Sequence, residues 1–276
     1  MVFPRGRWAR LYGAARVRTT ASDNTVMPAP QRFALRLAYL GSGFAGWQRQ
    51  LGRRTVQGTL EAALATLYGQ PVPVVGAGRT DAGVHAAGQV AHFDAPFPIP
   101  AGGLVRALAG LLPAEVRVRR AWPVDASFDA RRSALAKLYR YQIAWGPPLL
   151  PWEALRRWEV AHRLEVRSIR AGLAAVVGEH DFAAFASSGH SGRGARGTTR
   201  TITTARMSCR GRRVDLVVIG DGFLRGMVRR ITGALVEVGR GARPPEWIAA
   251  LLADPGTRPP APTAPAHGLT LERVYY

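Results

Sequence analysis

The chain has 276 residues, 47% of them hydrophobic, and its 38 lysines and arginines exceed its 18 aspartates and glutamates, giving a formal net charge of +20. This length and apolar content suffice for one large or two modest globular domains and exclude an intrinsically disordered chain. The excess of basic residues points to a polyanionic partner, above all nucleic acid. A genomic bias toward arginine explains why Lys137 is the only lysine, but it does not explain the shortage of acidic residues.

Several other classes of protein are excluded. Cys209 is the only cysteine, so no internal disulfide and no cysteine pair for zinc can form, which fits a reducing cytoplasm. No apolar stretch approaches the length of a membrane span, and the histidines lack the spacing and acidic neighbours of a metal site. Residues 1–31 are rich in arginine, with Asp23 as their only acid. Their composition also occurs in transit peptides, but we interpret them as a basic, disordered tail or as sequence ahead of a start at Met27.

The first half of the chain predicts the element order β-α-β-β-α-β. Apolar residues alternate over residues 32–39 as in a half-buried strand, and Thr55 precedes a helix whose apolar residues, from Val56 to Leu67, share one face. The remaining elements are two short strands, a second helix and a fourth strand, at residues 72–75, 90–93, 101–111 and 116–118.

The same order recurs from Leu138 onward. The expected strands cover residues 139–144, 201–209, 214–219 and 271–275, and the helices cover 168–177, 225–238 and, as an addition, 245–252. The sequence therefore predicts an α+β protein of two ferredoxin-like βαββαβ units packed around a central cleft, one over residues 32–136 and one over residues 137–276. A cleft between two units is a natural substrate site. Residues 187–197 and 255–262 are expected to be irregular linkers.

The run from Gly78 to His85 (Gly-Arg-Thr-Asp-Ala-Gly-Val-His) places one carboxylate on a tight turn between the two short strands. An aspartate in a turn usually hydrogen-bonds its own backbone, which is the alternative for Asp81. Here the flanking glycines leave room for a ligand, and Arg79 supplies a permanently charged donor beside the acid. We therefore interpret this run as a catalytic loop.

A competing motif lies upstream of this loop. Residues 41–46 (Gly-Ser-Gly-Phe-Ala-Gly) match the dinucleotide-binding fingerprint, so a nicotinamide-dependent dehydrogenase is an alternative. That motif needs a helix starting within its glycines, whereas residues 47–54 have no apolar period and contain Gly52. We interpret the segment as a loop facing RNA. Trp47 either stacks on a base or packs in the core.

Further short runs follow in a fixed order along the chain: Gly46-Trp47-Gln48-Arg49-Gln50, Gly88-Gln89-Val90, Phe128-Asp129-Ala130-Arg131, Tyr139-Arg140-Tyr141 and Met227-Val228-Arg229. Together with the run containing Asp81, they resemble the tRNA pseudouridine synthase A (TruA) family over residues 32–276. The chain departs from the family at Leu40, Ala109 and Arg230, where Asp, Asn and Asn are usual. These departures concern loop and RNA contacts, not the acid.

The resemblance implies the pseudouridine synthase fold and a homodimer that converts uridine to pseudouridine at positions 38 to 40 of the tRNA anticodon stem-loop. The reaction moves the sugar from N1 of the base to C5, an isomerisation that requires no cofactor. The resemblance implies that Asp81 is the catalytic nucleophile or base, acting on a base turned out of its stack. It implies that Tyr139 stacks on that base. It also implies that Arg79 either fills the space that the flipped nucleotide leaves or binds a phosphate.

A buried carboxylate takes up a proton unless a cation lies nearby. Residues 223–230 contain three arginines that fall largely off the apolar stripe of a helix, and for one or two of them a solvated face is the alternative. The resemblance selects Arg229, which we predict to be the counterion of Asp81 in the substrate site. Tyr141 shares a strand face with Tyr139, and core packing is its default role. A passive RNA-binding protein of the same fold is the alternative to an enzyme.

Overall fold

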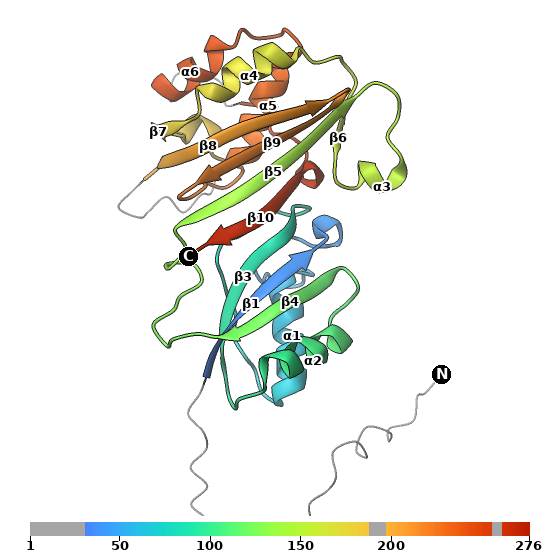
Figure 1. Ribbon diagram of the computed structural model, residues 1–276, viewed down its shortest axis with the longest axis vertical. Coiled ribbons are helices and arrows are strands. Elements are labelled where there is room, and N and C mark those ends of the chain that lie inside the picture. Colours follow the sequence, from blue (N-terminus) through green and yellow to red (C-terminus); the bar gives the residue numbers. More distant parts are fainter. Residues whose placement is uncertain (1–30, 188–196, 256–260) are drawn as a thin grey trace, which may run out of the picture.

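The computed structural model describes residues 31–187, 197–255 and 261–276. They form an elongated molecule with the N-terminal half at one end and the C-terminal half at the other, and one ten-stranded sheet runs through both (Figure 1). The predicted tail lies outside the described residues except for Gln31, which is already the first residue of a strand. Most of the two predicted linkers also lies outside the described residues.

The N-terminal half contains the predicted β-α-β-β-α-β order. Its elements are β1 (Gln31–Tyr39), α1 (Val56–Tyr68), β2 (Val75–Gly76), β3 (His85–Ala95), α2 (Ala101–Leu111) and β4 (Val116–Pro123). β1 lies between β4 and β3, and both pairings are antiparallel. Helix α1 begins where predicted, because the Thr55 hydroxyl accepts a hydrogen bond from the amide of Gly58 (3.2 Å) and caps the helix.

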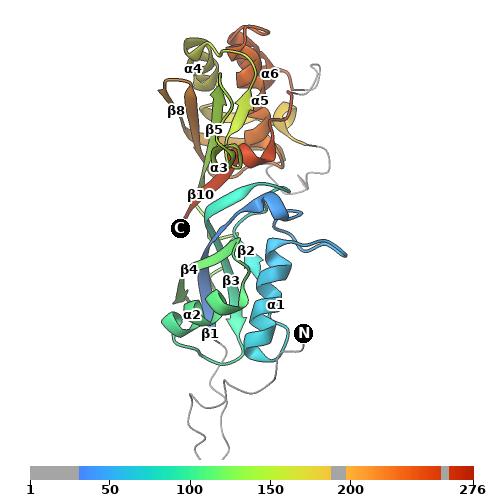
Figure 2. The same ribbon diagram turned by 90° about the vertical axis from the view of Figure 1, so that its right-hand side faces the viewer.

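The C-terminal half repeats this arrangement with additions. Its main elements are β5 (Ala136–Trp145), α4 (Val166–Ala174), β8 (Thr199–Arg210), β9 (Arg213–Gly220), α5 (Met227–Gly239) and β10 (Leu269–Tyr275). Short elements that the sequence pattern did not predict are α3 (Pro151–Ala154), β6 (Trp158–Val160) and β7 (Gly178–Asp181), whereas α6 (Glu246–Ala253) was predicted. The predicted α+β class is confirmed, and Figure 2 shows α1 alongside the N-terminal strands and α4 and α6 at the far end of the C-terminal half.

The two halves are joined through the sheet itself. β10 pairs with β5 on one edge, antiparallel, and with β3 on the other, parallel, at Thr270–His85 and Leu271–Ala86. This junction exists because β2 has only two residues and pairs with β3 at its other end, opposite Ala91 and His92. The prediction of a strand over residues 72–75 was therefore wrong except at Val75. Pro73, which lacks an amide hydrogen, does not favour a regular strand there.

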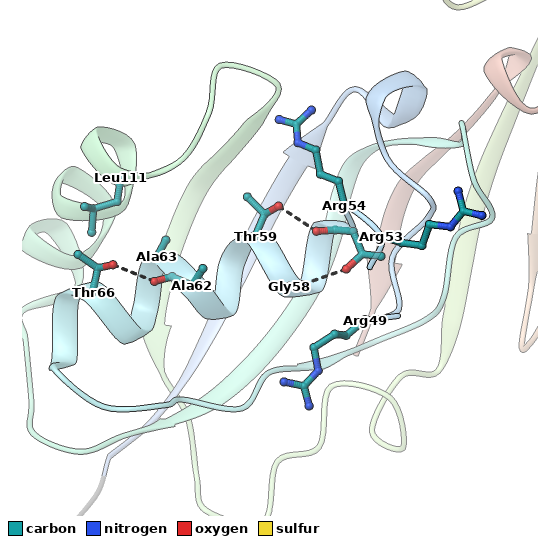
Figure 3. A pocket seen from close by; sticks show the side chains of 10 residues that line it. Arg49, Arg53, Arg54, Gly58, Thr59, Ala62, Ala63, Thr66 and Leu111 are labelled. Carbon is teal, nitrogen blue, oxygen red and sulfur yellow. Dashed lines mark hydrogen bonds between the residues drawn. The ribbon is translucent and has the colours of Figure 1, made fainter. Parts of the chain in front are cut away.

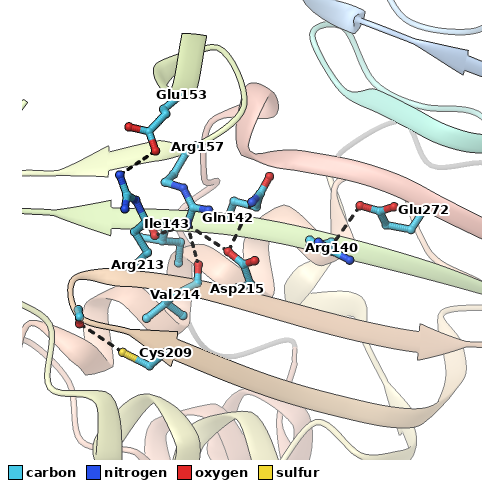
Figure 4. Close-up of polar contacts among 11 residues, drawn as sticks. Arg140, Gln142, Ile143, Glu153, Arg157, Cys209, Arg213, Val214, Asp215 and Glu272 are labelled. Atoms are coloured by element: carbon cyan, nitrogen blue, oxygen red, sulfur yellow. Dashed lines mark hydrogen bonds and ion pairs between the residues drawn. The ribbon is translucent and has the colours of Figure 1, made fainter. Parts of the chain in front are cut away.

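Alternation along β5 separates two faces of the sheet. Tyr139, Tyr141 and Ile143 are buried, whereas the intervening Arg140 and Gln142 are only partly buried. The polar face carries ion pairs such as Arg157 to Asp215 (3.0 Å) and Arg140 to Glu272 (3.4 Å), shown in Figure 4. Period-two alternation thus puts the tyrosines on the apolar face of the sheet.

Candidate active site

The Asp81 loop, residues 77–84 between β2 and β3, is held by core groups on several sides. The buried Thr80 hydroxyl hydrogen-bonds the Tyr39 hydroxyl (2.8 Å), and the Gln89 side chain donates to the carbonyl of Gly78 (2.8 Å). Burial raises the pKa of Tyr39 to about 12, while its hydrogen bonds to Thr80 and Gln89 oppose that shift. Fixed backbone and side-chain partners pre-organise the turn on which the carboxylate sits.

A second loop, residues 41–54, packs behind the first. The amide of Trp47 donates to the carbonyl of Thr80 (3.0 Å), and the Trp47 side chain is 2% exposed. Trp47 is therefore a core residue and not a stacking surface. Only a three-residue 3-10 helix, Gly41–Gly43, forms among these glycines, and α1 does not start until Val56. The helix that a dinucleotide fingerprint requires is thus absent from this described segment.

Gly46 fixes how closely the two loops approach. Its φ is +95°, and a β-carbon there would lie 2.7 Å from the carbonyl oxygen of Thr80. Gly46→Ala should therefore lower the free energy of unfolding by about 1–2 kcal/mol through left-handed backbone strain and by about 1–3 kcal/mol more through the clash. Gly52→Ala is the matched control, because Gly52 has φ +68° with no atom within 4 Å of the added carbon. Equal losses for both variants in chemical denaturation would show that the loops do not need this contact.

Asp81 lies between two arginines. Arg229 Nη1 donates to Asp81 Oδ2 at 3.3 Å, and Arg225 Nε lies 3.8 Å from Oδ1. The side chains of Asp81 and Arg229 are 25% and 20% exposed, so the pair is partly screened by water, whereas that of Arg225 is 62% exposed. Arg229 is in turn held by donation from Nε to the carbonyl of Ala264 (2.8 Å). The carboxylate thus has two cations beside it. Arg229 is anchored by a backbone carbonyl, whereas Arg225 is largely exposed.

Tyr139 on β5 lies near Asp81. Its side chain is buried, its ring meets Phe223 edge-on at 4.9 Å between centroids, and burial raises its pKa, with the nearby charges of Tyr39 and Asp81 adding to the shift. Tyr141, two residues on, donates its hydroxyl to the carbonyl of Pro265 (2.7 Å), which fits the packing role expected for it.

The structure therefore brings together Asp81, Arg229 and Tyr139, which come from a loop, a helix and a strand. Arg79 is exposed and makes no hydrogen bond or ion pair with any other described residue. Sequence reasoning gave no role to Arg225, Gln89 or Phe223. Arg225 precedes Arg229 by four residues, a helical spacing, but Gly226 adopts φ +73° and α5 begins only at Met227, two residues later than predicted.

His85, the last residue of the loop motif, has a structural environment. It is 1% exposed and opens β3, its Nδ1 accepts from the amide of Gly41 (3.0 Å), and its Nε2 lies 3.1 Å from the carbonyl of Leu155. With Nδ1 accepting, the ring hydrogen is on Nε2 and the ring is neutral. Burial lowers the pKa of His85, which favours the same neutral form.

A basic surface lies at the N-terminal end of α1. A pocket of about 500 Å³ is lined there by Arg49, Arg53, Arg54, Thr55, Gly58, Thr59, Ala62, Ala63, Thr66 and Leu111. Figure 3 shows the three arginines spread around the N-terminal end of α1. Arg54 is paired with Glu115 (3.2 Å) and Arg49 with Glu61 (3.5 Å), while Arg53 has no ion pair within the described part of the chain.

Within residues 31–187, 197–255 and 261–276, no group of three or more histidine, cysteine, aspartate or glutamate side chains is placed to hold a metal ion. None of the helices in these ranges is both long and apolar enough to cross a membrane.

Comparison with known proteins gives the class to which this fold and site belong. A family model described as tRNA pseudouridine synthase matches residues 37–131 and 173–276, and the chain belongs to that family. Asp81 and Arg229 lie inside the matched segments, and Tyr139 lies between them. The family resemblance found in the sequence is confirmed.

Individual relatives narrow the class. The chain is 42% identical over 245 residues to the tRNA pseudouridine synthase A of Myxococcus xanthus, covering 89% of this chain and 92% of that protein. It is 43% identical to the tRNA pseudouridine synthase A of Syntrophotalea carbinolica (87% and 94% covered) and 46% identical to that of Frankia casuarinae (89% of each). These alignments cover nearly the full length of each relative.

Proposed function

We propose that this protein is a tRNA pseudouridine synthase that isomerises uridine at positions 38 to 40 of the anticodon stem-loop. The observation that carries the proposal is the Asp81 carboxylate on a buttressed turn, 3.3 Å from Arg229 and beside Tyr139. The alignment with proteins named tRNA pseudouridine synthase A supports the substrate. The choice of positions 38 to 40 rests on the resemblance of the motifs.

In the proposed reaction, Asp81 acts as nucleophile or base on a uridine turned out of its stack. The bond from the sugar to N1 breaks, a bond from the sugar to C5 forms, C5 loses its hydrogen and N1 gains one, so atoms and electrons balance without a co-reactant. Arg229 and Arg225 lie 3.3 Å and 3.8 Å from the carboxylate oxygens and hold the group that either role uses in place. The Tyr139 ring, which meets Phe223 edge-on, is the surface on which the target base stacks beside Asp81. Arg79, exposed on the same loop, enters the space that the base leaves or contacts a phosphate.

We also propose that the enzyme is a cytoplasmic homodimer, since the single cysteine fits a reducing compartment and the family resemblance implies a dimer. Leu150, Trp152 and Leu155 in and around α3 support a subunit contact, because their exposed fractions of 50%, 67% and 54% leave apolar surface open to water.

The proposed division into residues 32–136 and 137–276 is supported by β5, which starts at Ala136 and opens the second unit.

The test of function is conversion of uridine in tRNA. Purified protein is incubated with unmodified tRNA, and pseudouridine is located by chemical labelling specific to it. Labelling at positions 38 to 40 supports the proposal. Tight tRNA binding with no labelling would indicate a passive RNA-binding protein. Saturable binding of a nicotinamide dinucleotide would favour the dehydrogenase alternative.

The net charge of +20 predicts salt-dependent binding. If Arg49 and Arg53 contact phosphates, the double variant Arg49→Gln and Arg53→Gln should reduce the slope of log affinity against log salt by about two units. The matched control neutralises Arg167 and Arg170, which are exposed on α4 at the far end of the molecule (Figure 1). Filter binding across salt concentrations measures both. Equal slopes for the two double variants would show that the pocket along α1 does not contact the RNA.

A further inference from the structure

Lys137, the only lysine of the chain, lies against the loop that carries Asp81. It sits on β5 between Gly220 of β9 and Val274 of β10, two residues before Tyr139. A β-carbon on Gly78 would lie 3.3 Å from Lys137 Cε and 3.6 Å from Nζ, so the end of the side chain rests on that glycine. The ammonium group is therefore held next to the loop, and Gly78 leaves the space for it.

The ammonium group has no anion of its own in the described structure. The Lys137 side chain makes no hydrogen bond or ion pair with any described residue, although the residue is only partly exposed. Burial lowers its pKa, and the charges of Arg131 and Arg200 lower it further, while Asp221 opposes them. The charges that act on this partly buried ammonium thus include two further cations. Such a group destabilises the free protein, and a bound anion would offset that cost.

We propose that Lys137, with Arg131 and Arg200 beside it, binds a backbone phosphate of the RNA next to the target uridine. This inference rests on the proposed function, because RNA supplies the anion. Gly78 and Asp81 are three residues apart, so their α-carbons are separated by at most about 10 Å. This separation allows an RNA strand whose base reaches Asp81 to place a neighbouring phosphate over Gly78. A lysine suits this position as a compact charge with rotating donors.

Substitution separates this role from packing. Lys137→Met keeps an unbranched apolar arm and removes the charge, so it should lower tRNA affinity about ten-fold and reduce the salt slope by about 0.7 unit. Because an uncompensated cation is removed, the melting temperature of the free protein should stay the same or rise. Arg170→Met, on exposed α4, is the control and should change neither affinity nor slope. Unchanged affinity and slope for Lys137→Met, or a lowered melting temperature with unchanged slope, would overturn the proposal.

The single lysine also permits a direct footprint. Apart from the terminal amine, a small acylating reagent has only Lys137 to modify, and Arg170→Lys supplies a reference amine on α4. With tRNA at about 100 times its dissociation constant, acylation of Lys137 should slow about ten-fold or more while the reference amine keeps its rate. Equal rates at Lys137 with and without tRNA would overturn the proposal.

The contacted phosphate can be identified with synthetic stem-loop RNAs that carry one neutral methylphosphonate at a time around the target uridine. At the contacted linkage, the methylphosphonate and Lys137→Met should each weaken binding, and combining them should cost no more than either alone. Additive losses at every linkage would overturn the proposal. Failure of the proposed function is recognised separately, because the unsubstituted protein would then form no pseudouridine in any of these RNAs.

Discussion

Asp81→Asn is expected to lower pseudouridine formation by about four orders of magnitude or more while tRNA affinity changes little. Losses of this size follow removal of a nucleophile or base from a site whose binding groups remain. Asparagine keeps the size of the side chain and its capacity for turn hydrogen bonds, but it provides neither a nucleophilic oxygen nor a proton acceptor of comparable strength. Release of tritium from C5 of labelled uridine in tRNA measures the reaction directly, since C5 loses its hydrogen.

The matched control is Asp94→Asn. Asp94 lies in the same half of the molecule and is also paired with an arginine, Arg32 (2.7 Å), but its side chain is 56% exposed on β3. This variant should retain nearly full activity. If Asp81→Asn released tritium at a comparable rate, Asp81 would be a structural turn residue and another group would have to supply the chemistry.

Arg229→Met is expected to lower the free energy of unfolding by about 2–3 kcal/mol. It removes a charged donor from Asp81 and leaves the carbonyl of Ala264 without the hydrogen bond from Nε. The loss is smaller than for a fully buried pair, because the Asp81 side chain is 25% exposed and Arg225 stays 3.8 Å away. Activity should fall as well, since the remaining cation is an exposed side chain that holds the carboxylate less firmly.

A double-mutant cycle with Asp81→Asn isolates the direct interaction. The two losses should couple by about 0.5–2 kcal/mol in urea denaturation, because the second substitution removes the charge that the first left without its partner. Arg225→Met is the control, and as a mainly exposed cation it should cost less than about 1 kcal/mol. Strictly additive losses for Asp81 and Arg229 would show that the ion pair contributes nothing to stability.

Local signals predicted the regular elements well. Thr55 at the start of α1 and the apolar spacing after it depend only on neighbouring residues, so the helix was predicted at its observed start. The three-residue β6 and the four-residue α3 and β7 are too short to show a period, and they were missed. β2 was misplaced because the valines around Pro73 are buried in the core without forming a strand.

The candidate site depended on information of longer range. Asp81 and Arg229 are 148 residues apart in the sequence, and no periodicity of the chain relates them. Their pairing was predicted from the family resemblance. Whether Trp47 stacks or packs could not be predicted from its neighbours in the sequence, because the answer lies in its contact with Gly76 on β2. The position of Lys137 beside Gly78 is likewise a product of sheet register.

The place of β10 in the sheet has a consequence for synthesis on the ribosome. The strand that joins the two halves is the last element in the chain, and Ala264, which holds Arg229, lies just ahead of it. During translation the edge of β3 at His85 and Ala86 therefore stays without its partner strand until Thr270 and Leu271 emerge. Unpaired strand edges favour association with other chains, so the nascent N-terminal half needs shielding at this edge. We therefore predict that a nascent chain is inactive before Ala264 emerges, because Arg229 then lacks the carbonyl that anchors it beside Asp81.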